Sequence, residues 1–297
     1  MGFSKLKHRQ MITKNHSENK AVKHTLENLY KRYNHRNLIK PDPLQFVYHF
    51  FDHRDMEIAG LLSAVLAYGR VEQIQNSLTK LFTVIGQKPY EFVVNFNHNK
   101  RKKLNGFKHR FNTGSDIADL LKLLKRVLRE YGSIEKYFLQ GYNQTDENII
   151  PALTKFSDTL LKIHASQNNG KSNRGLEFLL VSPSNGSACK RLNLFLRWMV
   201  REDHVDAGIW KSIDKAKLIV PIDVHMGRLC KFLGFHNNKT ISLKTAVEIT
   251  RHFSKIEPSD PVKYDFALSR IGIVENCTGK YGVKCKSCDL DLFCRQR

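Results

Sequence analysis

The sequence has no long hydrophobic run. None of its segments approaches about eighteen consecutive apolar residues, the length at which a stretch becomes a candidate membrane helix. The basic N-terminus is not followed by an apolar core, so it does not have the pattern of a secretory signal peptide. We therefore expect no membrane partner and a place in the cytoplasm.

Cysteine is scarce, with six residues in 297. With no export signal, this count indicates a reducing compartment. Four of the six follow the pattern Cys277-x7-Cys285-x2-Cys288-x5-Cys294, and four thiols so close together indicate a ligand set. Thiolates at such a spacing hold a [4Fe–4S] cluster or a zinc ion. Two disulfides are a third alternative, although nothing else in the sequence indicates secretion.

Acidic residues are few relative to basic ones. Lysine and arginine number 49 against 28 aspartates and glutamates, which gives a net charge of +21 and a pI near 9.8. A surplus of this size favours a polyanionic partner, and nucleic acid before a membrane surface. Charge alone is equally compatible with a generic basic protein or with an RNA-binding role.

Strand patterns are no longer than a few residues, and the sequence has neither an internal repeat nor a low-complexity tract. Helical periodicity recurs instead. Residues 58–67 are almost entirely apolar or small, which predicts a helix buried on all sides, and residues 117–128 form an amphipathic pattern that Gly132 ends. We therefore predict an all-α protein. Further helices are expected at about 21–33, 71–85, 188–201, 226–233 and 242–253, one or two more within 133–165, and a last one at 261–271 with Asp260 as its N-cap.

Asp223 stands where the extended apolar run 218–220 meets a helix that Gly234 ends. Within that helix, apolar residues recur at i, i+3, i+4 and i+7 from Met226. Asp223 is therefore an N-cap candidate, with its carboxylate beside unpaired N–H groups. For an isolated aspartate before a helix, capping alone is the ordinary interpretation.

Lys190 lies in the first turn of the predicted helix 188–201, after a stretch dense in turn residues, 182–187. The helix dipole disfavours a cation at that end, which suits an amine that must act as an uncharged nucleophile. Arg197 and Arg201 follow on the same helical stripe, at i+7 and i+11. Taken alone, these two arginines are more simply a solvated basic face.

Together these features resemble the helix-hairpin-helix DNA glycosylase superfamily, in particular its endonuclease III-like enzymes with an iron–sulfur loop. Members carry a catalytic lysine on the helix after a hairpin, a catalytic aspartate in a "VDTH"-like motif and, in many cases, a Cys-x6-Cys-x2-Cys-x5-Cys loop. Here Ile222-Asp223-Val224-His225 resembles the aspartate motif, and the cysteine loop has one extra residue in its first gap. Leu61-Leu62-Ser63-Ala64 resembles an early buried helix of the family. The matches are scattered from about residue 55 to the end.

Three departures set the chain apart from endonuclease III. The family hairpin has an LPGVG-type sequence, whereas residues 182–187 keep only one glycine. The separation between Lys190 and Asp223 is longer, and closer to that of the archaeal 8-oxoguanine glycosylases, which have no cluster. Val65 stands where family enzymes often have a glutamine that fills the gap left by the flipped base. The resemblance is therefore to a separate bacterial branch of the superfamily.

The resemblance implies a two-domain helical protein. Residues 45–200 are expected to form a helical bundle domain with the hairpin-like turn, and residues 201–297 a helical domain that ends in the four-cysteine loop. Residues 1–44 are expected to form a basic arm and a helix that packs with the C-terminal domain. The active site is expected in the cleft between the two helical domains.

The resemblance also implies a DNA repair glycosylase with associated AP-lyase activity. In such an enzyme Lys190 attacks the sugar C1′ and forms a Schiff base, while Asp223 stabilises the developing positive charge or assists deprotonation of the lysine. The four cysteines are expected to hold a structural [4Fe–4S] cluster, with zinc as the alternative. The expected partner is duplex DNA with a damaged or abasic nucleotide, bound by a monomer associated with the nucleoid.

The side chains expected to contact DNA are basic, hydroxylated or aromatic. Tyr68 and Arg70 occupy the family's DNA-facing turn, where a glycine-ended helix followed by a cation is an equally good interpretation. The run 100–103 suits a phosphate backbone, although a solvated loop is the more frequent meaning of such a run. The complete set is Tyr68, Arg70, Lys100, Arg101, Lys102, Lys103, Ser187 and Arg197.

Two other functions stay open. A non-catalytic nucleic-acid-binding protein of the same fold would keep the basic surface without lesion chemistry. Val65 and the single hairpin glycine favour this alternative, whereas the presence of both Lys190 and Asp223 speaks against it. Zinc-stabilised RNA binding needs only the charge and the cysteines, and it leaves Asp223 unexplained.

Overall fold

The computed structural model describes residues 20–273, residue 277 and residues 282–294 of the chain. Helical residues make up 62% of the structure and strand residues 2%, which confirms the all-α class predicted from the sequence. Within the described ranges, no helix is at once long enough and apolar enough to cross a membrane. The first part of the expected basic arm, residues 1–19, lies outside the described residues.

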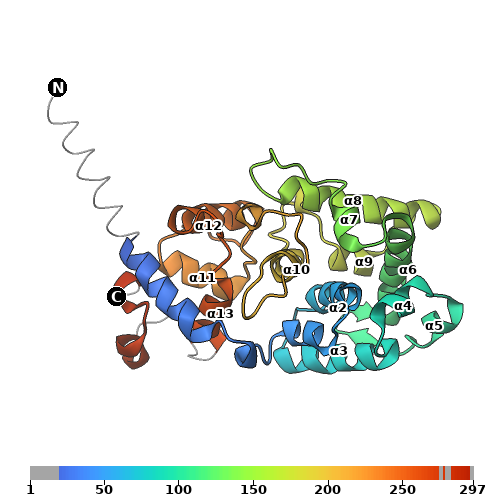
Figure 1. Ribbon diagram of the computed structural model, residues 1–297, viewed down its shortest axis with the longest axis horizontal. Coiled ribbons are helices and arrows are strands. Elements are labelled where there is room, and N and C mark those ends of the chain that lie inside the picture. Colours follow the sequence, from blue (N-terminus) through green and yellow to red (C-terminus); the bar gives the residue numbers. More distant parts are fainter. Residues whose placement is uncertain (1–19, 274–276, 278–281, 295–297) are drawn as a thin grey trace.

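The N-terminal half of the chain builds a group of helices around α2 and α6 (Figure 1). Helix α2 is buried from Met56 to its end, as its apolar sequence predicts, and α6 has the predicted amphipathic pattern and ends at Gly132 in the left-handed conformation. The elements are η1 (Arg36–Leu38), η2 (Pro43–His49), α2 (His53–Val65), α3 (Val71–Ile85), α4 (Pro89–Val94), α5 (His98–Lys102), β1 (Lys108–His109), β2 (Asn112–Thr113), α6 (Gly114–Tyr131), α7 (Ile134–Phe138), α8 (Ile150–Gln167) and α9 (Arg174–Leu179).

The C-terminal half places α11, α12 and α13 at the opposite end of the molecule from α5 (Figure 1). The predicted helix 188–201 begins two residues later and ends one residue earlier, as α10. The elements of this half are η3 (Pro183–Asn185), α10 (Lys190–Val200), η4 (Lys215–Lys217), α11 (Val224–Phe232), α12 (Leu243–Ile256), α13 (Asp265–Ile273), η5 (Val283–Ser287) and η6 (Asp291–Phe293).

Helix α10 lies between these two groups and packs against α2 (Figure 1). The two helices approach closely, because a Cβ placed on Gly60 would lie 2.8 Å from the Cε of Met199. A larger side chain at Gly60 would therefore require the end of the Met199 side chain to move. The first residue of α10 is Lys190, so this packing also fixes where that lysine stands.

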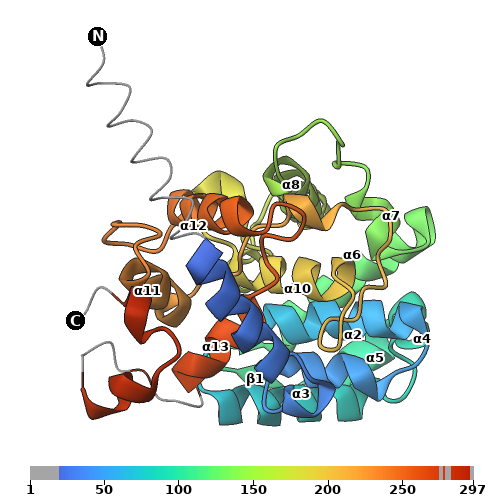
Figure 2. The same cartoon turned by 60° about the vertical axis from the view of Figure 1, so that its left-hand side comes forward.

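The N-terminal helix, described from residue 20 to residue 33, lies alongside the C-terminal segments in both views (Figures 1 and 2). Lys23 pairs with Glu257 at 3.1 Å, and Arg32 pairs with Asp289 at 2.6 Å. The ring of Tyr30 also packs edge-on against Tyr264. The N-terminal helix is therefore bound to the C-terminal segments by ion pairs and aromatic packing.

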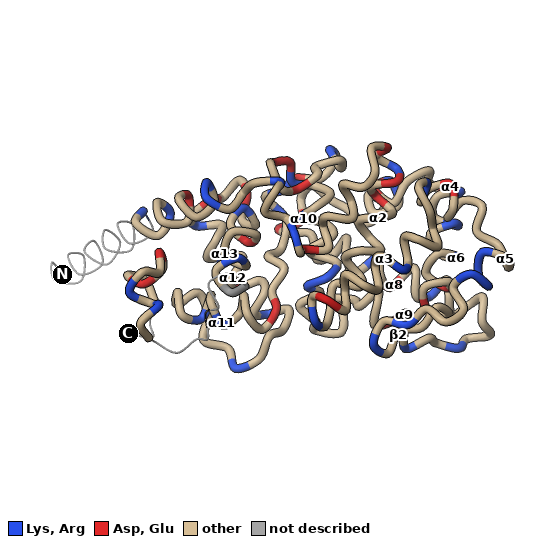
Figure 3. The backbone as a smooth tube through the Cα atoms, turned by 90° about the horizontal axis from the view of Figure 1, so that it is seen from below, with Lys and Arg blue, Asp and Glu red and all other residues tan. Residues whose placement is uncertain are grey.

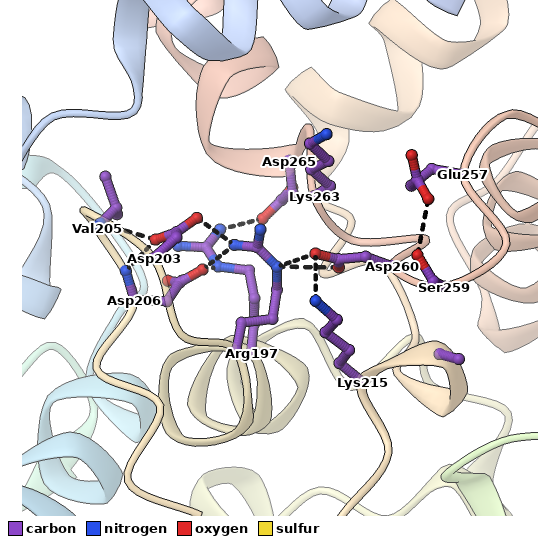
Figure 4. Close-up of polar contacts among 12 residues, drawn as sticks. Arg197, Asp203, Val205, Asp206, Lys215, Glu257, Ser259, Asp260, Lys263 and Asp265 are labelled. Carbon is purple, nitrogen blue, oxygen red and sulfur yellow. Dashed lines mark hydrogen bonds and ion pairs between the residues drawn. The ribbon is translucent and has the colours of Figure 1, made fainter.

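Arg197 of α10 and Arg201, the residue that follows α10, are buried in a network of carboxylates (Figure 4). Arg197 pairs with Asp206 at 3.2 Å and with Asp265, the first residue of α13. Arg201 pairs with Asp260 at 2.9 Å, and also with Asp206. Burial raises the pKa of Asp206 to about 6, and the two guanidinium groups oppose that rise. This network joins α10 to the loop that follows it and to α13.

The expectation that Arg197 contacts DNA is therefore wrong, and so is the alternative of a solvated basic face for Arg197 and Arg201. Arg197 is 2% exposed and Arg201 is 3% exposed, so neither guanidinium reaches a phosphate at the surface. The helical stripe that they share faces inward because acidic partners are supplied there by other parts of the chain.

We expect Arg197→Ala to lower the free energy of unfolding by about 3–5 kcal/mol, since Asp265 is then left buried without its arginine partner and Asp206 keeps only Arg201. Urea denaturation measures this change. The matched control is Arg251→Ala, which breaks a surface pair with Glu147 and is expected to cost less than about 1 kcal/mol. Unchanged stability together with weaker DNA binding would restore the surface interpretation.

Candidate active site

The turn before α10 determines how Lys190 is presented. Cys189, the residue that caps α10, has a φ of 46°, a left-handed conformation that costs a non-glycine residue energy. Its N–H donates to Ser187 Oγ, and its thiol donates to the carbonyl of Val181 at 3.4 Å. The hydroxyl of Ser187 is thus used within the turn, and its role as a DNA contact stays a prediction.

Asp223 caps α11, as its sequence position predicts. Its Oδ1 accepts a hydrogen bond of 2.9 Å from the N–H of Met226, which satisfies one of the free donors at the start of the helix. The conformation of Asp223 is extended, with φ at −116° and ψ at −171°, as is usual for such a cap. Capping uses one carboxylate oxygen and leaves the other available.

The second oxygen of Asp223 contacts Lys190. The distance between Lys190 Nζ and Asp223 Oδ2 is 3.0 Å, and both side chains are about one-third exposed. The structure thus brings together two residues that are 33 positions apart in the sequence. Each stands at the N-terminus of its helix, so two helix ends converge on this pair.

The pair shapes the electrostatics of the site. Burial raises the pKa of Asp223, but the charge of Lys190 and the hydrogen bond from Met226 lower it more, so the pKa lies below its ordinary value. Asp223 is therefore an anion across the neutral pH range. A persistent carboxylate next to a primary amine suits a reaction in which positive charge develops beside it.

Lys190 and Asp223 line a cavity of about 590 Å³. Its wall comes from both halves of the molecule, with Ala67 and Tyr68 after α2 and Leu268 on α13. The volume lies within the roughly 300–1,000 Å³ typical of small-molecule sites, and most of the lining is apolar. The cavity presents the Lys190 amine and the Asp223 carboxylate to a ligand of about that size.

Tyr68 has a structural role at the rim of this cavity. Its hydroxyl donates to the carbonyl of His109 at 3.0 Å and also contacts the side-chain oxygen of Asn112. Arg70 follows as the N-cap of α3, and its exposed side chain lines a second hollow together with Arg110. Of the two residues expected at the DNA-facing turn, Tyr68 thus lines the cavity that contains Lys190, and Arg70 lines the second hollow.

The run 100–103 divides into two kinds of residue. Lys100 Nζ donates to the carbonyl of Phe92 at 2.9 Å, and Arg101 pairs with Asp119 at 2.8 Å, so both are used within the fold. Lys102 and Lys103 are exposed. The run lies on α5, at the far end of the molecule from α11, as Figures 1 and 3 show. Any contact it makes with DNA is therefore separate from the cavity.

Arg191 is a functional candidate that the sequence analysis missed. It is 7% exposed, lines the cavity next to Lys190 and donates to the carbonyls of Val65, at 2.7 Å, and Phe178. Its guanidinium also lies 5.0 Å from the centre of the Tyr68 ring. Burial lowers the pKa of Arg191 to about 10. The spacing to apolar residues at i+3 and i+7 was the available signal for its burial.

The four cysteines of the C-terminal loop are each half-buried. Cys277 borders the cavity, and its carbonyl accepts a hydrogen bond of 3.1 Å from Arg228. The donor chemistry fits a [4Fe–4S] cluster or zinc. Within the described part of the chain, no three or more histidine, cysteine or acidic side chains are grouped closely enough to hold a metal ion, so the cluster stays a prediction from the spacing.

We expect the capping and the pairing roles of Asp223 to separate by substitution. Asp223→Ala removes the cap and is expected to lower the free energy of unfolding by about 1 kcal/mol, whereas Asp223→Asn keeps it. Because the folded pKa of Asp223 is lowered, its ionised form stabilises the fold fully above about pH 4, and this contribution is lost as the pH falls through the folded pKa.

Urea denaturation between neutral and acid pH measures both effects. The stability difference between the wild type and Asp223→Asn should shrink below about pH 4. Ser242→Ala, which removes the cap of α12, is the matched control and should show a loss without this pH dependence. Equal losses for Asp223→Asn and Asp223→Ala would contradict the capping role.

Comparison with known proteins gives one match. The model of a family described as a protein of unknown function (DUF2400) matches residues 42–274, which include Lys190 and Asp223 but none of the four loop cysteines. No curated protein and no solved structure matches the chain. Because the matched segment spans more than three quarters of the sequence, the chain belongs to the family DUF2400.

Proposed function

We propose that this protein is a DNA repair glycosylase with associated AP-lyase activity. The observation that carries the proposal is the contact of 3.0 Å between Lys190 Nζ and Asp223 Oδ2 at the wall of the cavity. A nucleophilic amine and a fixed anion within one cavity are the two groups that displacement of a base from a sugar requires. The resemblance of residues 222–225 to the glycosylase aspartate motif supports the same reaction.

A nucleobase in a duplex is out of reach of Lys190, so the substrate nucleotide has to be flipped out of the stack. The cavity has room for such a nucleotide, and its largely apolar lining suits the faces of a base. The net charge of +21 supplies general attraction to the phosphate backbone. We propose duplex DNA with a damaged or abasic nucleotide as the partner, bound by a monomer.

In the proposed reaction the neutral amine of Lys190 attacks the sugar C1′. The N–C1′ bond forms as the glycosidic bond breaks, and the departing base takes that electron pair and then a proton. Opening of the sugar ring gives a Schiff base between Lys190 and C1′. Loss of a proton from C2′ then expels the 3′ phosphate, which is the lyase step.

Asp223 has an electrostatic role in this scheme. Its lowered pKa makes it a weak proton acceptor and a persistent anion. It therefore stabilises the positive charge that develops on the sugar as the base departs. Because its other oxygen is held by the N–H of Met226, the carboxylate does not have to reorient during the reaction.

We expect borohydride to trap wild-type protein covalently on DNA that contains an abasic site, because the reductant converts the Schiff base into a stable amine. Lys190→Ala should abolish the adduct while DNA affinity stays within about twofold, since one charge among 49 contributes little to the overall attraction. Asp223→Asn should slow base release by about a hundredfold. Gel electrophoresis of the reduced complex measures the adduct.

The matched control is Lys231→Ala, which removes an exposed lysine of α11 and should leave trapping intact. If the wild type forms no adduct on oxidised, alkylated or abasic DNA, the glycosylase proposal fails. A non-catalytic nucleic-acid-binding role then takes its place, in which the pair of Lys190 and Asp223 is a structural ion pair.

We also propose that Cys277, Cys285, Cys288 and Cys294 hold a structural [4Fe–4S] cluster. The support is their spacing, which is close to that of the glycosylase loop. Anaerobically purified protein should contain iron and sulfide and be brown, and Cys285→Ser should lose the iron. The control is Cys230→Ala, a buried cysteine of α11 outside the loop. One zinc per chain without iron would contradict the cluster.

A further inference from the structure

A small β-hairpin stands beside the cavity. Strands β1 and β2 pair Lys108 with Thr113 and His109 with Asn112, and two residues connect them. The first, Arg110, has a φ of 54°, the positive value that such a tight turn requires. The second is Phe111. Because the turn is so short, both side chains project from the tip of the hairpin.

The hairpin is fixed at its base by side chains that are completely buried. His109 contacts Ser77 Oγ on α3 at 2.9 Å through one ring nitrogen and the carbonyl of Tyr68 at 3.0 Å through the other. Asn112 donates to the carbonyl of Gly175 on α9 at 3.0 Å. The base of the hairpin is thus hydrogen-bonded to α3, to the turn after α2 and to α9, and these contacts fix the position of the tip.

Phe111 is 54% exposed although it is part of an aromatic cluster. Its ring centre lies 4.5 Å from that of Phe178 and 5.5 Å from that of Tyr68. One side of the ring is packed and the rest faces solvent. A single exposed apolar residue is ordinary, so exposure alone carries no function. Phe111 is distinguished by its position, because it packs against Tyr68, which lines the cavity that contains Lys190.

Cations stand next to this aromatic tip. Arg110 packs over the turn after α2, since a Cβ on Gly69 would lie 2.9 Å from its Cδ. Arg110 and Arg70 line a hollow of about 600 Å³ with Gln73, Asn76 and one acid, Glu72. Arg70 is the N-cap residue of α3, and its side chain makes no capping hydrogen bond to that helix. The tip therefore pairs an exposed ring with groups that bind phosphate.

Base flipping leaves a gap in the duplex, and the unstacked neighbours cost a few kcal/mol unless an apolar side chain fills the space. The position at which family enzymes often fill it is not available here, because Val65 is completely buried. We propose that Phe111 enters the base stack of duplex DNA at the flipped nucleotide, while Arg110 and Arg70 hold the adjacent phosphates. This inference rests on the proposed function, because it assumes that Lys190 acts on a flipped nucleotide.

The test compares trapping on two substrates. An abasic site in a duplex has to be extruded, whereas one in a single strand is already accessible. We expect Phe111→Ala to slow borohydride trapping on duplex abasic DNA by at least roughly tenfold and to leave single-stranded trapping within about twofold. Phe111→Leu keeps an apolar wedge and should retain most of the duplex rate. A purely structural role for Phe111 would slow both substrates alike.

Phe51→Ala is the matched control. Phe51 is 95% exposed and lies just before α2, whereas Tyr68 lies just after that helix. At 1.5 Å per residue, α2 separates these two positions by roughly 20 Å. Trapping by Phe51→Ala should equal that of the wild type on both substrates. If Phe111→Ala traps duplex DNA as fast as the wild type, or loses both substrates equally, the inference is overturned.

A binding measurement keeps this outcome distinct from failure of the proposed chemistry. Both native tryptophans are buried, Trp198 at 0% and Trp210 at 2% exposure, so a Phe111→Trp variant carries an exposed fluorophore. Stacking in duplex DNA with a stable abasic analogue should quench that fluorophore, and intact duplex should quench it much less. Quenching without any trapped adduct contradicts the lyase and supports the wedge. Trapping without quenching contradicts the wedge alone.

Discussion

The fold depends on the neutralisation of two buried guanidinium groups. Arg197 and Arg201 enter the interior from α10 and meet carboxylates from the loop 203–206 and from the segment 260–265 (Figure 4). Buried ion pairs add little net stability over well-packed apolar residues, because desolvation offsets their attraction. The ion pairs instead determine how the helices are placed, because a buried charge is tolerated only where its partner lies within contact distance. Helix α10 therefore has one position relative to α13, while on its other side it packs against α2.

The site follows from that geometry. Lys190 is the first residue of α10, and Asp223 is held by the start of α11, which packs against α13. The ion pairs of Arg197 and Arg201 fix α10 relative to α13, and in this way they indirectly determine the distance between Lys190 and Asp223. The contact also places an anion where positive charge develops in the proposed reaction. A substrate that enters the cavity has to displace this contact before the amine attacks.

Local physics made part of this predictable from the sequence. The amphipathic pattern of α6 and the cap at Asp223 are encoded in neighbouring residues, so periodicity and capping rules identify them. The proximity of Lys190 and Asp223 is not local and was suggested only by resemblance. The burial of Arg197 was predicted wrongly, because arginine is rarely buried unless paired, and its partner Asp265 lies 68 residues away. The hairpin at 108–113 escaped notice because strands of two residues have no readable periodicity.

The buried network also changes the net charge that is left for the surface of the molecule. It removes four aspartates from solvent and only two arginines, so the remainder of the molecule is more basic than the net charge of +21 suggests. Lysine and arginine are spread along both halves of the chain (Figure 3). In the proposed function, attraction to DNA is then general, and the position along the DNA has to be chosen by a more local feature. We propose that this feature is the pair of Lys190 and Asp223 in the cavity together with Tyr68 at the cavity wall, whose ring packs against Phe111 and Phe178.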